Sequence, residues 1–115
     1  MLPAKSRIKS TRDFHTVFNR GKSQADALLV LYVLPRPNEC PRFGFSVSRK
    51  LGGSVQRNRV KRILREAAKA LLPEIAAGQD IVVIARNKSV DISLRQASAS
   101  MERLWSRLSG QSVER

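Results

Sequence analysis

One uninterrupted apolar run limits the folds open to this chain. Residues 27–34, ALLVLYVL, carry no charge and are followed by Pro35. A run this short, bounded by polar residues and a proline, is typical of a buried β-strand, because buried helices are usually longer. The chain is therefore expected to build a sheet that contains this strand.

The rest of the chain supplies further strands and helices. Apolar and small side chains alternate strictly over 43–48, which predicts a half-buried strand, and another apolar run covers 80–86. A short extended piece near 22–24 is expected to pair separately. Helical periodicity marks 10–21, 57–72 and 91–108. The order αβββαβα predicts a single-domain α+β sandwich with its helices packed on one mixed sheet.

Local signals predict where the helices end. Ser10 and Asp13 have capping-box spacing at the start of the first helix, and Gly21 suits a left-handed residue just after it. Pro73 closes the middle helix, and Gly110 follows the last one. A loop is expected over 49–56, where two glycines let the backbone approach a ligand closely.

The charge of the chain is large and uneven. Of 115 residues, 22 are Lys or Arg and 9 are Asp or Glu, which gives a net charge of +13. Residues 1–65 carry 15 basic and 3 acidic side chains, whereas residues 66–115 carry 7 and 6. A small domain with this excess repels itself, and polyanions relieve that repulsion. A binding surface for a polyanion is therefore expected in the first half of the chain.

Other features disfavour whole classes of protein. Cys40 is the only cysteine, which excludes an internal disulfide and a thiolate cluster for zinc. No apolar stretch reaches the ~18 residues of a membrane span, and the first ten residues contain no signal-peptide core. We expect a cytoplasmic protein without a membrane partner. It is expected to be one polyanion-binding domain over 1–115, with an ordered core at about 5–108.

The segment 57–72 has two chemically distinct faces. Its apolar stripe consists of Val60, Ile63, Leu64, Ala67 and Leu71. Spacings of three and four stack the residues of the opposite face one turn above another: Arg57, Asn58, Lys61, Arg62, Arg65 and Lys69. Stacked like charges destabilise an isolated helix, so phosphates, which attract Arg and Lys, are the expected partners.

The stretch from Ser48 to Glu66, SRKLGGSVQRNRVKRILRE, resembles the signature of the bacterial ribonuclease P protein family. Two departures are small: Ser54 stands where the family usually has Ala, and Arg49 where Lys is common. Segments outside the signature also follow the family's order, among them Arg12-Asp-Phe14, the Leu-Tyr-Val-Leu strand and Ile84-Ala-Arg86. The resemblance covers residues 5–108.

The resemblance implies a ferredoxin-like fold, of the type also seen in domain 2 of ribosomal protein S5. It also implies a role as the protein subunit of ribonuclease P, in a 1:1 complex with the catalytic RNA, which removes the 5′ leader of precursor tRNA. Mg²⁺ bound mainly by the RNA would carry the chemistry, with no organic cofactor. The RNA subunit would bind to Arg49, Lys50, Arg57, Asn58, Arg59, Lys61, Arg62 and Arg65. A metal or anion site on the protein is implied without an assigned position.

The family's leader-binding cleft lies between the first helix and the sheet. Aromatic residues beside basic ones support it, because rings in a positive groove stack on the bases of single-stranded RNA. The expected residues are Arg12, Phe14, Phe18, Lys22 and Tyr32. Phe14 and Phe18 also form a stripe with Val17 that is equally typical of core packing. Both interpretations of these two residues stay open.

Catalytic residues are not expected in the protein itself. His15 is the only histidine, the carboxylates are scattered, and no Walker-type phosphate loop is present. The main alternative is a structural, ribosomal-type RNA-binding protein, which would explain charge and size but not the whole signature. A DNA-binding regulator usually has a second helix directly before its recognition helix, whereas a strand precedes 57–72. A membrane-surface helix would need bulkier apolar residues opposite its charges.

Overall fold

The computed structural model describes residues 3–37, 39–75 and 78–113. Its sheet has the strand order β1-β2-β4-β3. β2 pairs antiparallel with both β1 and β4, whereas β3 and β4 are parallel and need a crossover between them. The strands are β1 (Lys22–Ala25), β2 (Leu29–Pro35), β3 (Arg42–Val47) and β4 (Gln79–Ala85). The predicted α+β sandwich on one mixed sheet is confirmed.

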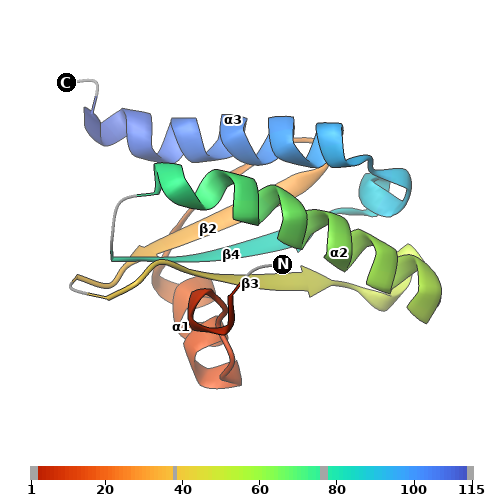
Figure 1. Cartoon of the computed structure of the whole chain (residues 1–115), viewed down its shortest axis with the longest axis horizontal. Helices are drawn as coiled ribbons and strands as arrows, with labels where there is room; N and C mark the ends of the chain where they lie inside the picture. The colour runs from red at the N-terminus through yellow and green to blue at the C-terminus, as the bar shows by residue number, and fades with distance from the viewer. Residues whose placement is uncertain (1–2, 38, 76–77, 114–115) are drawn as a thin grey trace.

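Helices cover both faces of this sheet. α2 (Ser54–Leu71), which forms the crossover, lies beside α3 (Leu94–Val113) over one face, and α1 (Thr11–Arg20) lies on the other, as Figure 1 shows. The alternation of side chains along β2 explains the arrangement: Leu29 and Leu31 are buried in the core shared with α2 and α3, whereas Tyr32 contacts α1. The sheet therefore presents two chemically different faces.

The main core lies between the sheet and the α2–α3 layer. Leu64 of α2, Met101 and Leu104 of α3, and Phe43 and Ile81 of the sheet are fully buried in it. The apolar stripe predicted for 57–72 is confirmed, with Ile63 packed at its margin. Burial of this apolar surface stabilises the fold and turns the basic side of α2 outward. In the described part of the chain, no helix is long and apolar enough to cross a membrane.

Three helix boundaries differ from the prediction. α2 begins at Ser54 instead of 57, because Gly52, with φ of 127°, turns the backbone there and Gly53 caps the helix. α3 begins at Leu94 instead of 91, because Ser93 and Gln96 form a capping box, with bonds of 3.0 and 3.1 Å. α3 also continues past Gly110, which therefore does not end it.

Residue 21 differs from the prediction in its conformation. Ser10 caps α1 as expected, accepting the Asp13 N–H at 3.0 Å. Gly21, however, is extended, with φ of −78°. A Cβ at this position would lie 2.6 Å from the carbonyl oxygen of Val17 and 2.9 Å from that of Val33. Close packing of two backbone segments, rather than a left-handed turn, is what excludes a side chain there.

Candidate nucleic-acid interface

The outward side of α2 carries its basic residues in two rows. Arg57, Lys61 and Arg65 are spaced by four residues and are half-buried, and the Arg57 Nε–H donates to the Gly52 carbonyl oxygen at 3.2 Å. The other row is exposed and consists of Asn58, Arg62 and Lys69. The 3₁₀ turn Arg49–Leu51 precedes this helix and adds two exposed cations, Arg49 and Lys50. The structure thus gathers seven of the eight predicted RNA-subunit residues around α2.

Arg59, the eighth, faces a different part of the fold. Its Nη2 donates to the Ile92 carbonyl oxygen at 2.8 Å, and its Nη1 donates to that of Val90 at 3.3 Å. These carbonyls belong to the segment that leads into α3. Arg59 remains exposed, but these two bonds link α2 to the start of α3 and occupy both Nη atoms.

A hollow of about 290 Å³ opens at the outer edge of β3. The N-terminal segment runs along this edge, where the Ile8 N–H donates to the Phe43 carbonyl oxygen at 2.8 Å. Four cations line the hollow together with three aromatic residues: Arg7, Lys9, Lys61 and Arg65, with Phe14, Phe43 and Phe45. We call it the β3-edge hollow. Its N-terminal cations were not among the predicted site residues, because nothing local to residues 7–9 shows that they pair with β3.

Two donors at this hollow have no partner. Within the described residues, the Nε atoms of Arg7 and Arg65 are buried and make no hydrogen bond. A buried donor without a partner costs about 1–3 kcal/mol. Both arginines line the β3-edge hollow together with Lys9 and Lys61, and this concentration of positive charge suits an anion.

Three aromatic side chains gather on the α1 side of the sheet. The rings of Phe18 and Tyr32 are 4.8 Å apart between centroids and tilted by 39°. Phe18 is 47% exposed, and Phe14 and Tyr32 are half-buried. Val17 is the fully buried member of the α1 stripe. We call Phe14, Phe18 and Tyr32 the aromatic face.

The two basic residues predicted beside these rings are placed differently. Arg12 is exposed on α1. Lys22 pairs with Val33, whose side chain belongs to the core under α2 and α3. Directly opposed residues of an antiparallel pair project to the same side of a sheet. The Lys22 side chain therefore projects from the face of the sheet opposite to that of Tyr32. The structure does not bring Lys22 to the aromatic face.

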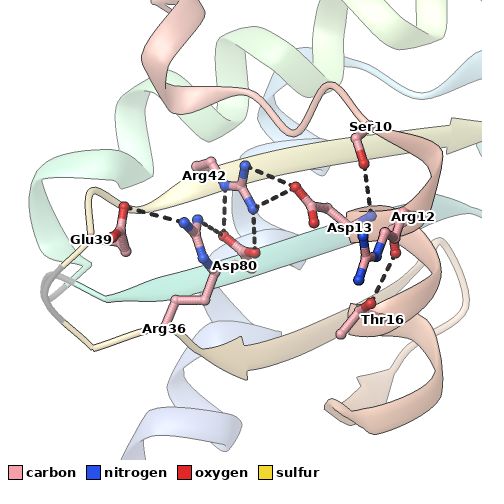
Figure 2. Close-up of polar contacts among 8 residues, drawn as sticks. All are labelled: Ser10, Arg12, Asp13, Thr16, Arg36, Glu39, Arg42 and Asp80. Atoms are coloured by element: carbon pink, nitrogen blue, oxygen red, sulfur yellow. Dashed lines mark hydrogen bonds and ion pairs between the residues drawn. The ribbon is translucent and has the colours of Figure 1, made fainter.

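A chain of ion pairs joins the sheet to α1, as Figure 2 shows. Asp80 on β4, whose side chain is 3% exposed, accepts from Arg42 Nε at 3.0 Å and Nη2 at 2.8 Å, and from Arg36 Nη1 at 3.0 Å. Arg42 also reaches Asp13 of α1 at 3.3 Å, and Arg36 reaches Glu39 at 3.2 Å. The hydrogen bonds from Arg42 to Asp80 raise the pKa of the guanidinium. These two arginines are neutralised within the fold, so they add little to an RNA-binding surface.

Metal ligands do not cluster in the described part of the chain. No three His, Cys, Asp or Glu side chains come together there in a way that could hold a metal ion. The carboxylate of Asp80 is bonded to arginines, and that of Asp26 is bonded to Ser100, Arg103 and two backbone amides. We therefore assign no residue of this chain to a metal.

Comparisons with known proteins agree with this geometry. The family model described as Ribonuclease P matches residues 2–109. A ribonuclease P protein component from Shouchella clausii is 41% identical over 102 residues, covering 88% of this chain and 84% of the relative. One from Bacillus cereus is 40% identical over 108 residues, covering 92% and 93%.

Solved structures show the same relationship. The RNase P protein of Staphylococcus aureus superposes with a TM-score of 0.80 at 35% identity, covering 90% of this chain and 94% of that one. The RNase P protein of Thermotoga maritima gives a TM-score of 0.76 at 30% identity, covering 84% and 92%. Signature, fold and relatives coincide, and the chain belongs to the bacterial ribonuclease P protein family.

Proposed function

We propose that this protein binds the catalytic RNA of ribonuclease P through α2 and holds the 5′ leader of precursor tRNA on its aromatic face. The β3-edge hollow carries the proposal. There, cations of α2 and of the N-terminal segment converge beside Phe14, which also belongs to the aromatic face. One continuous surface can therefore contact two RNA segments.

The α2 side of this surface suits phosphates. Arg7, Lys61 and Arg65 line the hollow, and their positive charges attract a phosphate. Charge-assisted hydrogen bonds to a phosphate are about twice as strong as neutral ones. The exposed cations Arg49, Lys50 and Arg62 extend the contact along a phosphate backbone.

The α1 side suits unpaired bases. Phe18 is 47% exposed and already lies against Tyr32. Stacking of one base on an aromatic ring contributes about 1–3 kcal/mol. Since about 1.4 kcal/mol is a tenfold change in affinity, one stacked base would strengthen leader binding roughly five- to a hundredfold.

In this proposal the protein contributes affinity and the RNA contributes chemistry. Mg²⁺ would be bound mainly by the RNA subunit and would supply the activated water for hydrolysis. The protein, with its net charge of +13, screens the repulsion between catalytic RNA and precursor tRNA. We propose one protein per catalytic RNA, acting in the cytoplasm.

The test is cleavage of precursor tRNA by a bacterial ribonuclease P RNA at low Mg²⁺, with and without this protein. We expect strong stimulation by the protein and no cleavage by the protein alone. Tight RNA binding without stimulation would instead indicate a structural RNA-binding protein. Cleavage by the protein alone would contradict the assignment of chemistry to the RNA.

A further inference from the structure

We propose that Asp13 is a positioning residue for the aromatic face. Through Arg42 it ties the first turn of α1 to Asp80, and this tie sets where Phe14 and Phe18 lie over the sheet. The inference rests on the proposed leader-binding role of that face. Asp13 itself is not proposed to contact RNA.

The helix that carries these rings is held by few contacts. α1 has 10 residues, fewer than the ~12–15 that an isolated helix needs to be stable in water. Val17 is its only fully buried apolar residue among those described, and Phe18 is largely exposed. The placement of α1 therefore depends on how its two ends are attached to the sheet.

The two ends are attached by different means. At the C-terminal end, Gly21 brings the backbone against the carbonyl of Val33. At the N-terminal end, Ser10 bonds only within the helix turn, whereas the Asp13 carboxylate reaches out to β3. The backbone bond from Ile8 to Phe43 fixes the segment before the helix, and the Asp13–Arg42 pair is the side-chain tie between the first turn of α1 and the sheet, as Figure 2 shows.

Arg42 is a well-anchored partner for this tie. Two bonds of 3.0 and 2.8 Å hold its guanidinium on the buried Asp80 carboxylate. Its Nη1 and Nη2 are then both 3.3 Å from Asp13 Oδ2. Because the guanidinium is fixed in advance, less side-chain entropy is lost on pairing than in an ordinary surface ion pair.

For Asp13→Asn, the change in charge and the loss of the positioning role predict opposite effects on RNA affinity. Asp13→Asn removes a negative charge, which by charge alone strengthens binding to a polyanion. If Asp13 positions α1, the same change weakens binding of the leader. Glu39→Gln is the matched control, because Glu39 ends the other arm of the network, on Arg36, and lies outside α1. The two side chains are similarly accessible, at 43% and 56% exposed.

The experiment measures the affinity of the reconstituted holoenzyme for precursor tRNA with and without a leader, using a leader that contains 2-aminopurine. We expect Asp13→Asn to weaken binding of the leader-bearing precursor about two- to fivefold, the size of an ion pair's contribution. Stacking-dependent quenching of the 2-aminopurine should fall as well. Binding of leaderless tRNA should not change. Glu39→Gln should not weaken either substrate, and Asp13→Glu should restore most of the loss.

Leader affinity of Asp13→Asn that equals or exceeds that of the wild type would overturn the proposal. So would equal losses in Asp13→Asn and Glu39→Gln. Phe18→Ala separates this inference from the proposed function. If Phe18→Ala weakens leader binding and Asp13→Asn does not, only the positioning role is wrong. If Phe18→Ala also has no effect, the leader does not lie on the aromatic face.

Discussion

Asp26 provides the sharpest test of the interactions that hold this fold together. Its Oδ1 accepts the backbone N–H groups of Leu28 and Leu29, both at 2.9 Å, within the turn between β1 and β2. Its Oδ2 accepts from Ser100 Oγ at 2.6 Å and from Arg103 Nη2 at 2.9 Å on α3. One carboxylate therefore joins the turn to the helix that covers the sheet.

The pKa of Asp26 gives the size of the effect. Burial alone would raise this pKa, but the hydrogen bonds from Ser100, from the Leu29 backbone and from Arg103 lower it from 3.8 to about 2. At ~1.36 kcal/mol per pH unit, that gap corresponds to about 2 kcal/mol of folding free energy. Since the folded pKa lies below the unfolded one, this stability is present above about pH 4 and is lost as the pH falls toward 2.

We therefore expect Asp26→Asn to lower the free energy of unfolding by about 2 kcal/mol at pH 7. At roughly 4 °C per kcal/mol for a domain of this size, the Tm should fall by about 8 °C. Urea and thermal unfolding of both proteins between pH 2 and 7 should show the difference shrinking below about pH 4. Asp91→Asn, at an exposed position, is the control and should stay within about 0.5 kcal/mol of wild type. Equal stability at pH 7, or a gap that does not change with pH, would refute the reasoning.

Four further substitutions test the interface and its support. Arg62→Ala should weaken RNA-subunit binding and reduce the salt slope by about 0.7–0.9, whereas Arg59→Ala should lower stability by about 1 kcal/mol and keep the slope. A slope that falls equally in both, measured from ~50 to 200 mM salt, would place Arg59 on the RNA. Gly44→Ala should destabilise the protein by about 1–3 kcal/mol in thermal unfolding, because its Cβ would lie 2.8 Å from the Phe14 ring. Tyr32→Ala should reduce affinity for leader-bearing precursor more than for mature tRNA; equal losses would indicate a packing role.

The elements of this fold could be predicted from the sequence because their signals are local. Strand 29–35 follows from an unbroken apolar run, and the α2 core stripe from a period close to 3.6 residues. The cations of α2 lie outward because the same helix buries its apolar side. The family signature covers this same helix, so the proposed RNA-subunit face was the part of the candidate interface that the sequence predicted best.

Helix ends and glycine conformations were harder to predict from the sequence. Apolar periodicity alone places the start of the last helix at 91, whereas the capping box of Ser93 and Gln96, which the sequence contains, sets it at 94. Gly21 follows the first helix as a left-handed terminator would, yet a side chain there is excluded by the carbonyls of Val17 and of Val33, and Val33 lies on β2. Contacts of that kind have no signature in the neighbouring residues.

Only the tertiary structure decided which hydrogen-bond partner each basic side chain has. Arg42 meets Asp80 across 38 residues of sequence, and Arg59 meets the Ile92 carbonyl across 33. In the sequence these arginines look the same as Arg62; Arg59 and Arg62 are both exposed, but the Arg59 guanidinium donates to carbonyls of the fold. The excess of positive charge is a property of composition. Whether a given cation is available to RNA depends on which carboxylates and carbonyls the folded chain brings within hydrogen-bond distance of it. The sequence therefore determined that this protein carries a basic helix on an α+β sheet, and the packing of distant segments determined which of its cations are bonded within the protein.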